Sequence, residues 1–138
     1  ALKERLEDEG TPVTTVVHAA GVGQLSALEC VGAGEVVSVV EGKVAGAVAL
    51  DAVFGGGGLD AFVLFSSIAA TWGSGSQGVY AAANAHLDAL AEQWRAAGRA
   101  ATSVAWGPWA GGGLVHEGGE EQLRRRGLPV MDPEHALT

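Results

Sequence analysis

Four side chains have the types and spacing needed to deliver a proton to a carbonyl group. They are Lys43, Ser67, Tyr80 and Asn84. Ser67 ends an apolar segment, 59–67, that is typical of a buried strand. Tyr80 and Asn84 stand one turn apart in an alanine-rich segment, 79–97, that is typical of a helix. Ligands of open α/β sheets bind at the carboxyl ends of strands, so the spacing predicts a site where a hydroxyl faces a phenol and an amide.

Such a site can support hydride chemistry. A phenol has a pKa of about 10 and donates its proton readily only when its ionised form is stabilised, which a nearby ammonium achieves. Lys43, in a small-residue segment at 41–50, is the candidate ammonium. We expect Ser67 to hold the carbonyl, Tyr80 to donate the proton, Lys43 to tune Tyr80 and anchor a ribose, and Asn84 to position a water or the lysine. No side chain can supply a hydride, so the pattern requires a cofactor.

Each of these residues also has a structural alternative when it is taken alone. Ser67 suits a cap after its strand, Tyr80 a packing residue, Lys43 a solvated surface charge and Asn84 an amide on a helix face. The joint spacing favours the catalytic interpretation. Tyr80 is also the only tyrosine in the chain, so no other phenol competes for the role.

Three short motifs make the chain resemble a known family. They are Leu-Phe-Ser-Ser at 64–67, Tyr-Ala-Ala-Ala-Asn-Ala-His-Leu-Asp-Ala-Leu-Ala at 80–91 and Val-Ala-Trp-Gly-Pro-Trp at 104–109. With them the chain resembles, over nearly its whole length, the catalytic half of a ketoreductase domain of a modular type I polyketide synthase, in the short-chain dehydrogenase/reductase superfamily. Free-standing reductases of the superfamily usually carry lysine four residues after the tyrosine. Here Asn84 takes that place and Lys43 precedes Ser67 by 24 positions, as in the synthase branch.

The resemblance implies the chemistry of the site. The four residues named first become a catalytic tetrad, the cofactor becomes NADPH, and the substrate becomes a β-ketoacyl thioester on an acyl carrier protein. Other domains of the same synthase are implied partners. The resemblance also implies contacts to the cofactor from Ala19, Ala20, Gly21, Lys43, Phe65, Ser66, Tyr80, Gly107 and Pro108.

Three further positions bear on stereochemistry through the same resemblance. B-type ketoreductases usually carry Leu-Asp-Asp in the loop after the His-Ala-Ala-Gly strand end, and segment 18–26 lacks it. Trp72 stands eight residues before Tyr80, as in the A-type, and Gln77 stands where the epimerising subgroup has histidine. The A1 subtype is implied, giving an S-hydroxyl (L-type) without epimerisation, with Leu114 near the substrate. An aromatic packed on a glycine-rich loop is the alternative for Trp72.

Composition limits the other classes of function. The chain has 138 residues, of which 48% are hydrophobic, enough for one soluble globular domain. A net charge of −8 argues against nucleic-acid binding, and no apolar run predicts a membrane span or signal peptide. Cys30 is alone and the four histidines are dispersed, so we expect a cytoplasmic protein without a disulfide or a metal site.

The order of the predicted elements indicates an α/β fold. Strands are expected at 12–18, 59–65 and 100–106, and helices at 1–10, 34–54, 79–97, 117–126 and 133–137, the last capped by Asp132. Segment 69–77 is expected to be a loop, and 55–58 a glycine turn. This alternation predicts part of a Rossmann-like, doubly wound parallel sheet with right-handed crossovers, the short-chain dehydrogenase/reductase fold. Strands this apolar are expected to be covered by helices on both faces.

Two glycine-rich stretches need separate interpretations. Segment 107–113 leaves a strand's carboxyl end, and its composition suits either a lid over the cofactor or a flexible connection. Segment 21–26 lacks the third glycine of a dinucleotide fingerprint. The phosphate-binding strand and helix are therefore not found here, and we expect residues 1–138 to be the C-terminal part of a ketoreductase catalytic domain. Either the sequence is part of a larger domain, or a second chain completes the sheet.

Three functions are compatible with these observations. The first is the NADPH-dependent ketoreductase described above. The second is a non-catalytic half that serves as a scaffold or docking surface in a megasynthase, against which the intact tetrad argues. The third is a free-standing short-chain dehydrogenase acting on a small ketone or alcohol, which Asn84 in place of lysine disfavours.

Overall fold

The computed structural model describes residues 2–111, 119–125 and 127–136, and the chain forms two compact units, 1–105 and 106–138. The first unit contains α1 (Leu2–Asp8), β1 (Thr15–His18), the 3₁₀ turn η1 (Leu28–Cys30), α2 (Ala33–Val40), η2 (Glu41–Ala45), α3 (Gly46–Phe54), β2 (Ala61–Ser67), α4 (Ala69–Trp72), α5 (Gly78–Ala96) and most of β3 (Ala101–Trp106). The second contains α6 (Gly119–Arg125) and α7 (Pro133–Ala136).

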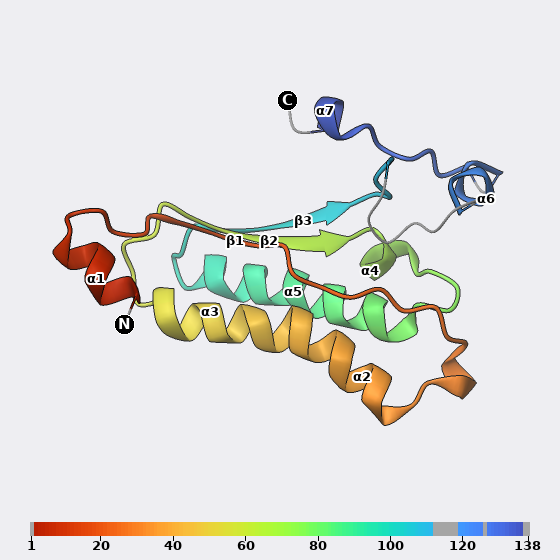
Figure 1. The fold of residues 1–138 in the computed structure, drawn as a ribbon, viewed down its shortest axis with the longest axis horizontal. Helices are drawn as coiled ribbons and strands as arrows, with labels where there is room; N and C mark the ends of the chain where they lie inside the picture. The colour runs from red at the N-terminus through yellow and green to blue at the C-terminus, as the bar shows by residue number, and fades with distance from the viewer. Residues whose placement is uncertain (1, 112–118, 126, 137–138) are drawn as a thin grey trace. The chain divides into compact units, whose positions relative to one another are not determined.

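A three-stranded sheet forms the centre of the first unit, in the order β1-β2-β3. Strands β1 and β2 are parallel, in a register that runs from Thr15 opposite Ala61 to His18 opposite Leu64. The arrows of β2 and β3 point the same way in Figure 1. The predicted α/β fold with a parallel sheet is confirmed.

The helices of this unit gather on one side of the sheet, with α3 and α5 lying along it (Figure 1). Burial alternates along β2, where Phe62 and Leu64 point into the core and their neighbours are half-buried. The core also takes in Val16, Ala47, Leu87, Ala91, Trp94 and Ala101. On β1, Val17 points the other way and is 54% exposed. Within the described part of this unit, helices therefore cover one face of the sheet, whereas the apolar strands predicted helices on both faces.

The helix predicted at 34–54 is present, but it contains a π-helical turn. Between α2 and α3, the segment η2 carries hydrogen bonds that reach five residues back, including one from Gly46 N–H to Glu41 O. Such turns are rare and often mark functional positions. Lys43 lies within this one, so the wide turn coincides with a predicted catalytic residue.

The segment 69–77 was expected to be a loop, and that expectation is wrong for its first half. Residues 69–72 form the short helix α4, which Gly73 ends with a φ of +75°. Helix α5 begins at Gly78, one residue before the predicted start. A four-residue helix is too short to show an apolar repeat, which explains why the sequence pattern did not indicate it.

Backbone hydrogen bonds organise the second unit. Met131 N–H donates to Pro108 O at 2.7 Å, and Ala110 N–H donates to Met131 O at 2.8 Å. Segment 107–111 is therefore held to a distant part of the chain, and residues 112–113 of the predicted lid or flexible connection lie outside the described residues. Asp132 caps α7 as predicted, accepting from Glu134 N–H at 2.9 Å.

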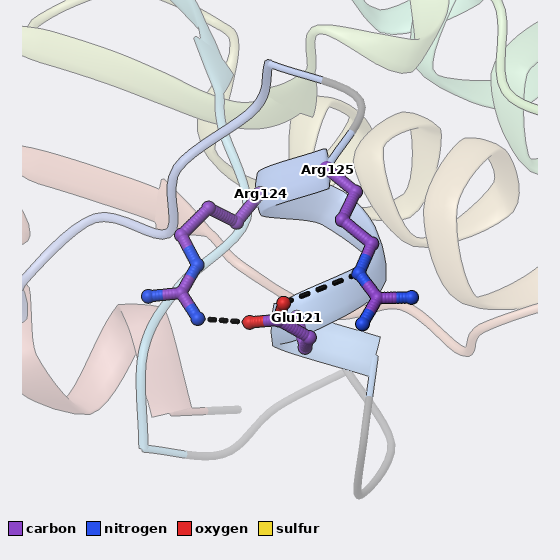
Figure 2. A network of polar contacts seen from close by, with 3 residues as sticks. All are labelled: Glu121, Arg124 and Arg125. Carbon is purple, nitrogen blue, oxygen red and sulfur yellow. Dashed lines mark hydrogen bonds and ion pairs between the residues drawn. The ribbon is translucent and has the colours of Figure 1, made fainter.

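Two arginines of this unit share one acidic partner on their own helix. Arg124 and Arg125, on α6, both contact the carboxylate of Glu121 (Figure 2). These side chains are exposed, so the pairs contribute little to stability.

Removing a core side chain should test the one-sided packing. We expect Leu64→Ala to lower the free energy of unfolding by about 2–5 kcal/mol, because it leaves a cavity among fully buried neighbours. Leu28→Ala is the matched control at an exposed position and should change stability little. Chemical unfolding followed by fluorescence measures both, and equal effects would contradict the assigned core.

Candidate active site

The ammonium of Lys43 is buried, with only 4% of the residue exposed. Its Nζ donates to the carbonyl oxygen of Phe65 at 2.7 Å. The same atom lies 5.5 Å from the centroid of the Tyr80 ring, within the range of a cation–π contact. The alternative of a solvated surface charge for Lys43 is therefore wrong. Strand β2, the π turn and helix α5 meet at this amine.

Two glycines make room for this arrangement. A Cβ on Gly21 would lie 2.6 Å from Cε of Lys43, closer than side-chain atoms approach one another. A Cβ on Gly46 would lie 2.8 Å from the His18 ring. The buried His18 in turn donates from Nε2 to the carbonyl oxygen of Lys43 at 2.8 Å. His18, for which the sequence predicted no contact, thus ties the end of β1 to the π turn.

Burial governs the charge of this lysine. Removal from water disfavours the ammonium and lowers the pKa of Lys43 below its ordinary value of 10.5, and the carboxylate of Asp88 acts in the opposite direction. Asp88 also accepts a hydrogen bond from the hydroxyl of Ser103 at 2.6 Å. The lysine is therefore held where its proton is released more easily than in water.

Tyr80 and Asn84 are buried side by side on α5. The amide Nδ2 of Asn84 donates to the carbonyl oxygen of Tyr80 at 2.8 Å, and Ser66 donates from its hydroxyl to the carbonyl oxygen of Asn84 at 3.2 Å. Asn84 is 0% exposed, and its Oδ1 has no hydrogen-bond partner among the described residues. A buried acceptor left open in this way suits a bound water or ligand donor.

Ser67 joins the group through the short helix α4. Its hydroxyl oxygen accepts from Ala69 N–H at 3.2 Å. Ala69 packs in a buried cluster with Tyr80, Val39 and Ala83. Among the described residues, Ser67 is thus linked to Tyr80 through packing of α4 rather than by a hydrogen bond. This bond is the cap that was given as the structural alternative for Ser67. Because the oxygen only accepts in it, the hydroxyl proton can still be donated to a ligand.

The other predicted residues fall into separate groups. Ala19 and Ala20 follow β1 and are exposed, whereas Gln77 is half-buried at the start of α5. Trp72 ends α4 and is 69% exposed, so packing does not explain its side chain. Gly107 and Pro108 belong to the second unit, directly after β3, and Leu114 lies outside the described residues.

One contact of this region was not predicted at all. The side chain of Gln24, in the loop after β1, accepts hydrogen bonds from the backbone N–H groups of Val79 and Tyr80 at 2.9 and 3.1 Å. A glutamine in a glycine-containing loop carries no sequence signal for this role. An indirect signal is that α5 has no capping side chain of its own, so its first N–H groups need partners from elsewhere.

The geometry thus joins a buried lysine, a phenol and an open amide at the carboxyl end of a parallel strand, and comparison with known proteins agrees with it. The model of the family described as the KR domain matches residues 1–111. The chain belongs to the KR domain family. The resemblance to a polyketide synthase ketoreductase is confirmed, and the roles of single residues stay predictions.

Individual relatives of this KR chain are large synthases. It is 52% identical over 138 residues to the polyketide synthase GfsA of Streptomyces halstedii, covering 100% of this chain and 2% of GfsA. The solved structure of PlmKR1, a ketoreductase from the first module of phoslactomycin biosynthesis in Streptomyces sp. HK803, is 50% identical with a TM-score of 0.91, over 99% of this chain and 32% of that one. A solved A1-type ketoreductase is 43% identical with a TM-score of 0.89, over 99% and 30%.

The described parts of the chain contain neither a candidate metal site nor a candidate membrane span. No three histidine, cysteine, aspartate or glutamate side chains gather there to hold a metal ion. Among the helices of the same residues, none has both the length and the apolar character needed to cross a membrane.

The lowered pKa of Lys43 makes stability depend on pH. Below the folded-state pKa, both states carry the ammonium and the folded state bears its full burial cost. As the pH rises toward 10.5, the folded amine becomes neutral while the unfolded amine is still protonated, so this cost is relieved. We expect Lys43→Met to be the more stable form near neutral pH and its advantage to shrink in alkali. Thermal unfolding measured across this pH range checks the trend, and a difference that stays constant with pH would contradict it.

Proposed function

We propose that the chain is the catalytic part of a ketoreductase that reduces a β-ketoacyl thioester, carried on an acyl carrier protein, to the β-hydroxyacyl thioester with NADPH. The observation that carries this proposal is the buried ammonium of Lys43 beside the Tyr80 ring. Burying a cation costs free energy, and here the cation lies beside a phenol at the end of a parallel strand. This combination favours a functional role over a purely structural one. Membership of the KR domain family supports the reaction class.

The residues at this site fit a nicotinamide cofactor. Gly21 lacks a Cβ and so lets the backbone after β1 approach Lys43 closely. Lys43 has three N–H donors and gives one to Phe65 O, so within the part of the chain that the structure describes two remain for ribose hydroxyls. When bound, NADPH supplies the hydride that adds to the carbonyl carbon. The choice of NADPH over NADH rests on the family resemblance.

The chain's own residues would handle the proton. Tyr80 gives its phenolic proton to the ketone oxygen as negative charge develops there, and Ser67 donates a hydrogen bond to the same oxygen. The ammonium of Lys43 stabilises the phenolate left behind. The open Oδ1 of Asn84 can hold a water that returns a proton to the phenol. Hydride on carbon and proton on oxygen together make the hydroxyl product.

The rest of the reductase would lie in other residues of the parent protein. The chain spans 2% of GfsA and 32% of PlmKR1, and its sheet leaves Val17 exposed on one face. We propose that an N-terminal part, which binds the dinucleotide phosphates, completes this sheet. The acyl carrier protein and the other synthase domains are the remaining partners. The free, exposed thiol of Cys30 suits the reducing cytoplasm.

We also propose the A1 stereochemical class, which gives an S-hydroxyl without epimerisation. Trp72 projects from the end of α4, with Gln77 five residues further along the chain at the start of the helix that carries Tyr80. An exposed indole beside this helix suits contact with an acyl chain better than it suits a core position. The likeness to a solved A1-type ketoreductase agrees with this assignment.

The role of Tyr80 is tested by removing one oxygen atom. In the whole polypeptide that carries these residues, Tyr80→Phe should lower the rate of NADPH oxidation with a β-ketoacyl thioester by about 10²-fold or more, because the proton donor is lost. Ser38→Ala removes an exposed hydroxyl and is the control. NADPH binding by fluorescence should persist in both variants. A fully active Tyr80→Phe would exclude the phenol as the acid, and failure of the wild type to bind NADPH would favour the scaffold hypothesis.

The stereochemical proposal is tested on the product. Trp72→Ala should lower the excess of the S-hydroxyl product, since the side chain that restricts the acyl chain is gone while Tyr80 is untouched. Chiral chromatography of the hydroxyacyl product measures this excess. Trp72→Phe, which keeps an aromatic ring, should retain most of it. An unchanged product from Trp72→Ala, or an R-hydroxyl from the wild type, would contradict the assignment.

A further inference from the structure

The loop after β1 contains a glutamine that is as buried as residues of the core. Gln24 is only 3% exposed, although the residues on both sides of it are exposed. Its Oε1 accepts two hydrogen bonds, from Val79 N–H at 2.9 Å and from Tyr80 N–H at 3.1 Å. Nearby in the same loop, Ser26 N–H donates to Ser76 O at 2.9 Å. The loop is thus attached both to the first turn of α5 and to the segment just before it.

These bonds supply a cap that the helix itself lacks. The first N–H groups of a helix have no partner within it, and a side chain at the N-cap position usually satisfies one of them. In α5 that position is held by Gln77, whose side chain makes no capping bond. Gln24 satisfies two of the open N–H groups from 55 and 56 positions away in the sequence. One of the two belongs to Tyr80 itself.

We propose that Gln24 is a positioning residue for Tyr80, which fixes the backbone from which the phenol projects. This inference rests on the proposed function, in which Tyr80 is the acid. From the helix side, Asn84 holds the Tyr80 carbonyl oxygen and Gln24 holds its N–H, so both peptide groups of the residue are fixed by buried side chains. With the backbone fixed, the position of the ring can change only through rotation of its own side-chain torsions.

The chemistry of the amide explains why glutamine suits this position. Its oxygen reaches both N–H groups, and its Nε2 is buried without a hydrogen-bond partner among the described residues. An apolar residue of similar length would leave one buried and one partly buried N–H group unsatisfied. A glutamate would keep the accepting oxygen, and the positive end of the helix dipole favours its charge. The proposal therefore requires a side chain that accepts these two hydrogen bonds, and the volume of the side chain is not enough by itself.

The experiment compares variants of the whole polypeptide at saturating NADPH and varied thioester, well below the unfolding temperature. Gln24→Met should lower kcat by about tenfold or more with little change in KM, because misplacing a reacting group by a fraction of an ångström weakens the chemical step more than binding. Gln24→Glu should recover most of the lost kcat. Gln93→Met makes the same change at an exposed position of α5 and should keep the wild-type kcat. If Gln24→Met does not fold, Gln24→Asn, whose amide is too short to reach, takes its place with the same expectation.

The outcomes separate this inference from the proposed function. Loss of kcat in Gln24→Met, recovery in Gln24→Glu and inactivity of Tyr80→Phe support both. A wild-type kcat in Gln24→Met, even with lowered thermal stability, overturns the positioning role alone and leaves a structural cap. Equal losses in Gln24→Met and Gln24→Glu also overturn it, since the retained acceptor then has no effect. Full activity of Tyr80→Phe overturns the proposed function regardless of Gln24.

Discussion

The buried ammonium of Lys43 is the interaction around which the first unit is organised. A charge removed from water needs partners close by, and here they are the carbonyl oxygen of Phe65 and the ring of Tyr80. These partners come from the end of β2 and the first turn of α5, so both elements must meet where the π turn delivers the lysine. The contacts of Lys43 therefore join the sheet, the π turn and α5 at the point where the chemistry is proposed.

Glycine serves this arrangement for two different physical reasons. At Gly21 and Gly46 the cause is space, because a Cβ there would collide with Lys43 or with the His18 ring. At Gly57 and Gly73 the cause is backbone conformation, since both have positive φ in turns. The first kind lies at the site and lets β1 approach the π turn, while the second kind only ends helices and turns the chain. The high glycine content therefore combines a functional requirement with an ordinary structural one.

The sequence predicted those parts of the fold and site that depend on local pattern. The apolar run ending at Ser67 and the turn spacing of Tyr80 and Asn84 predicted the strand and the helix that carry three members of the proposed tetrad. The π turn was missed because valines and alanines repeat through 36–47 as in a regular helix. The role of Gln24 was missed because its partners are more than 50 positions away and are backbone groups, which have no residue signature.

Most of the contacts that hold the predicted tetrad are made through main-chain atoms. The carbonyl oxygen of Lys43 is bound by His18, both peptide groups of Tyr80 are bound by side chains, and the carbonyl oxygen of Asn84 is bound by Ser66. Among the described residues, this mode of support leaves two protons of the ammonium, the phenolic hydroxyl and the amide oxygen of Asn84 available. Removing the phenolic oxygen of Tyr80 should therefore leave the shape of the site intact, because the bonds from Gln24 and Asn84 are made to main-chain atoms of this residue.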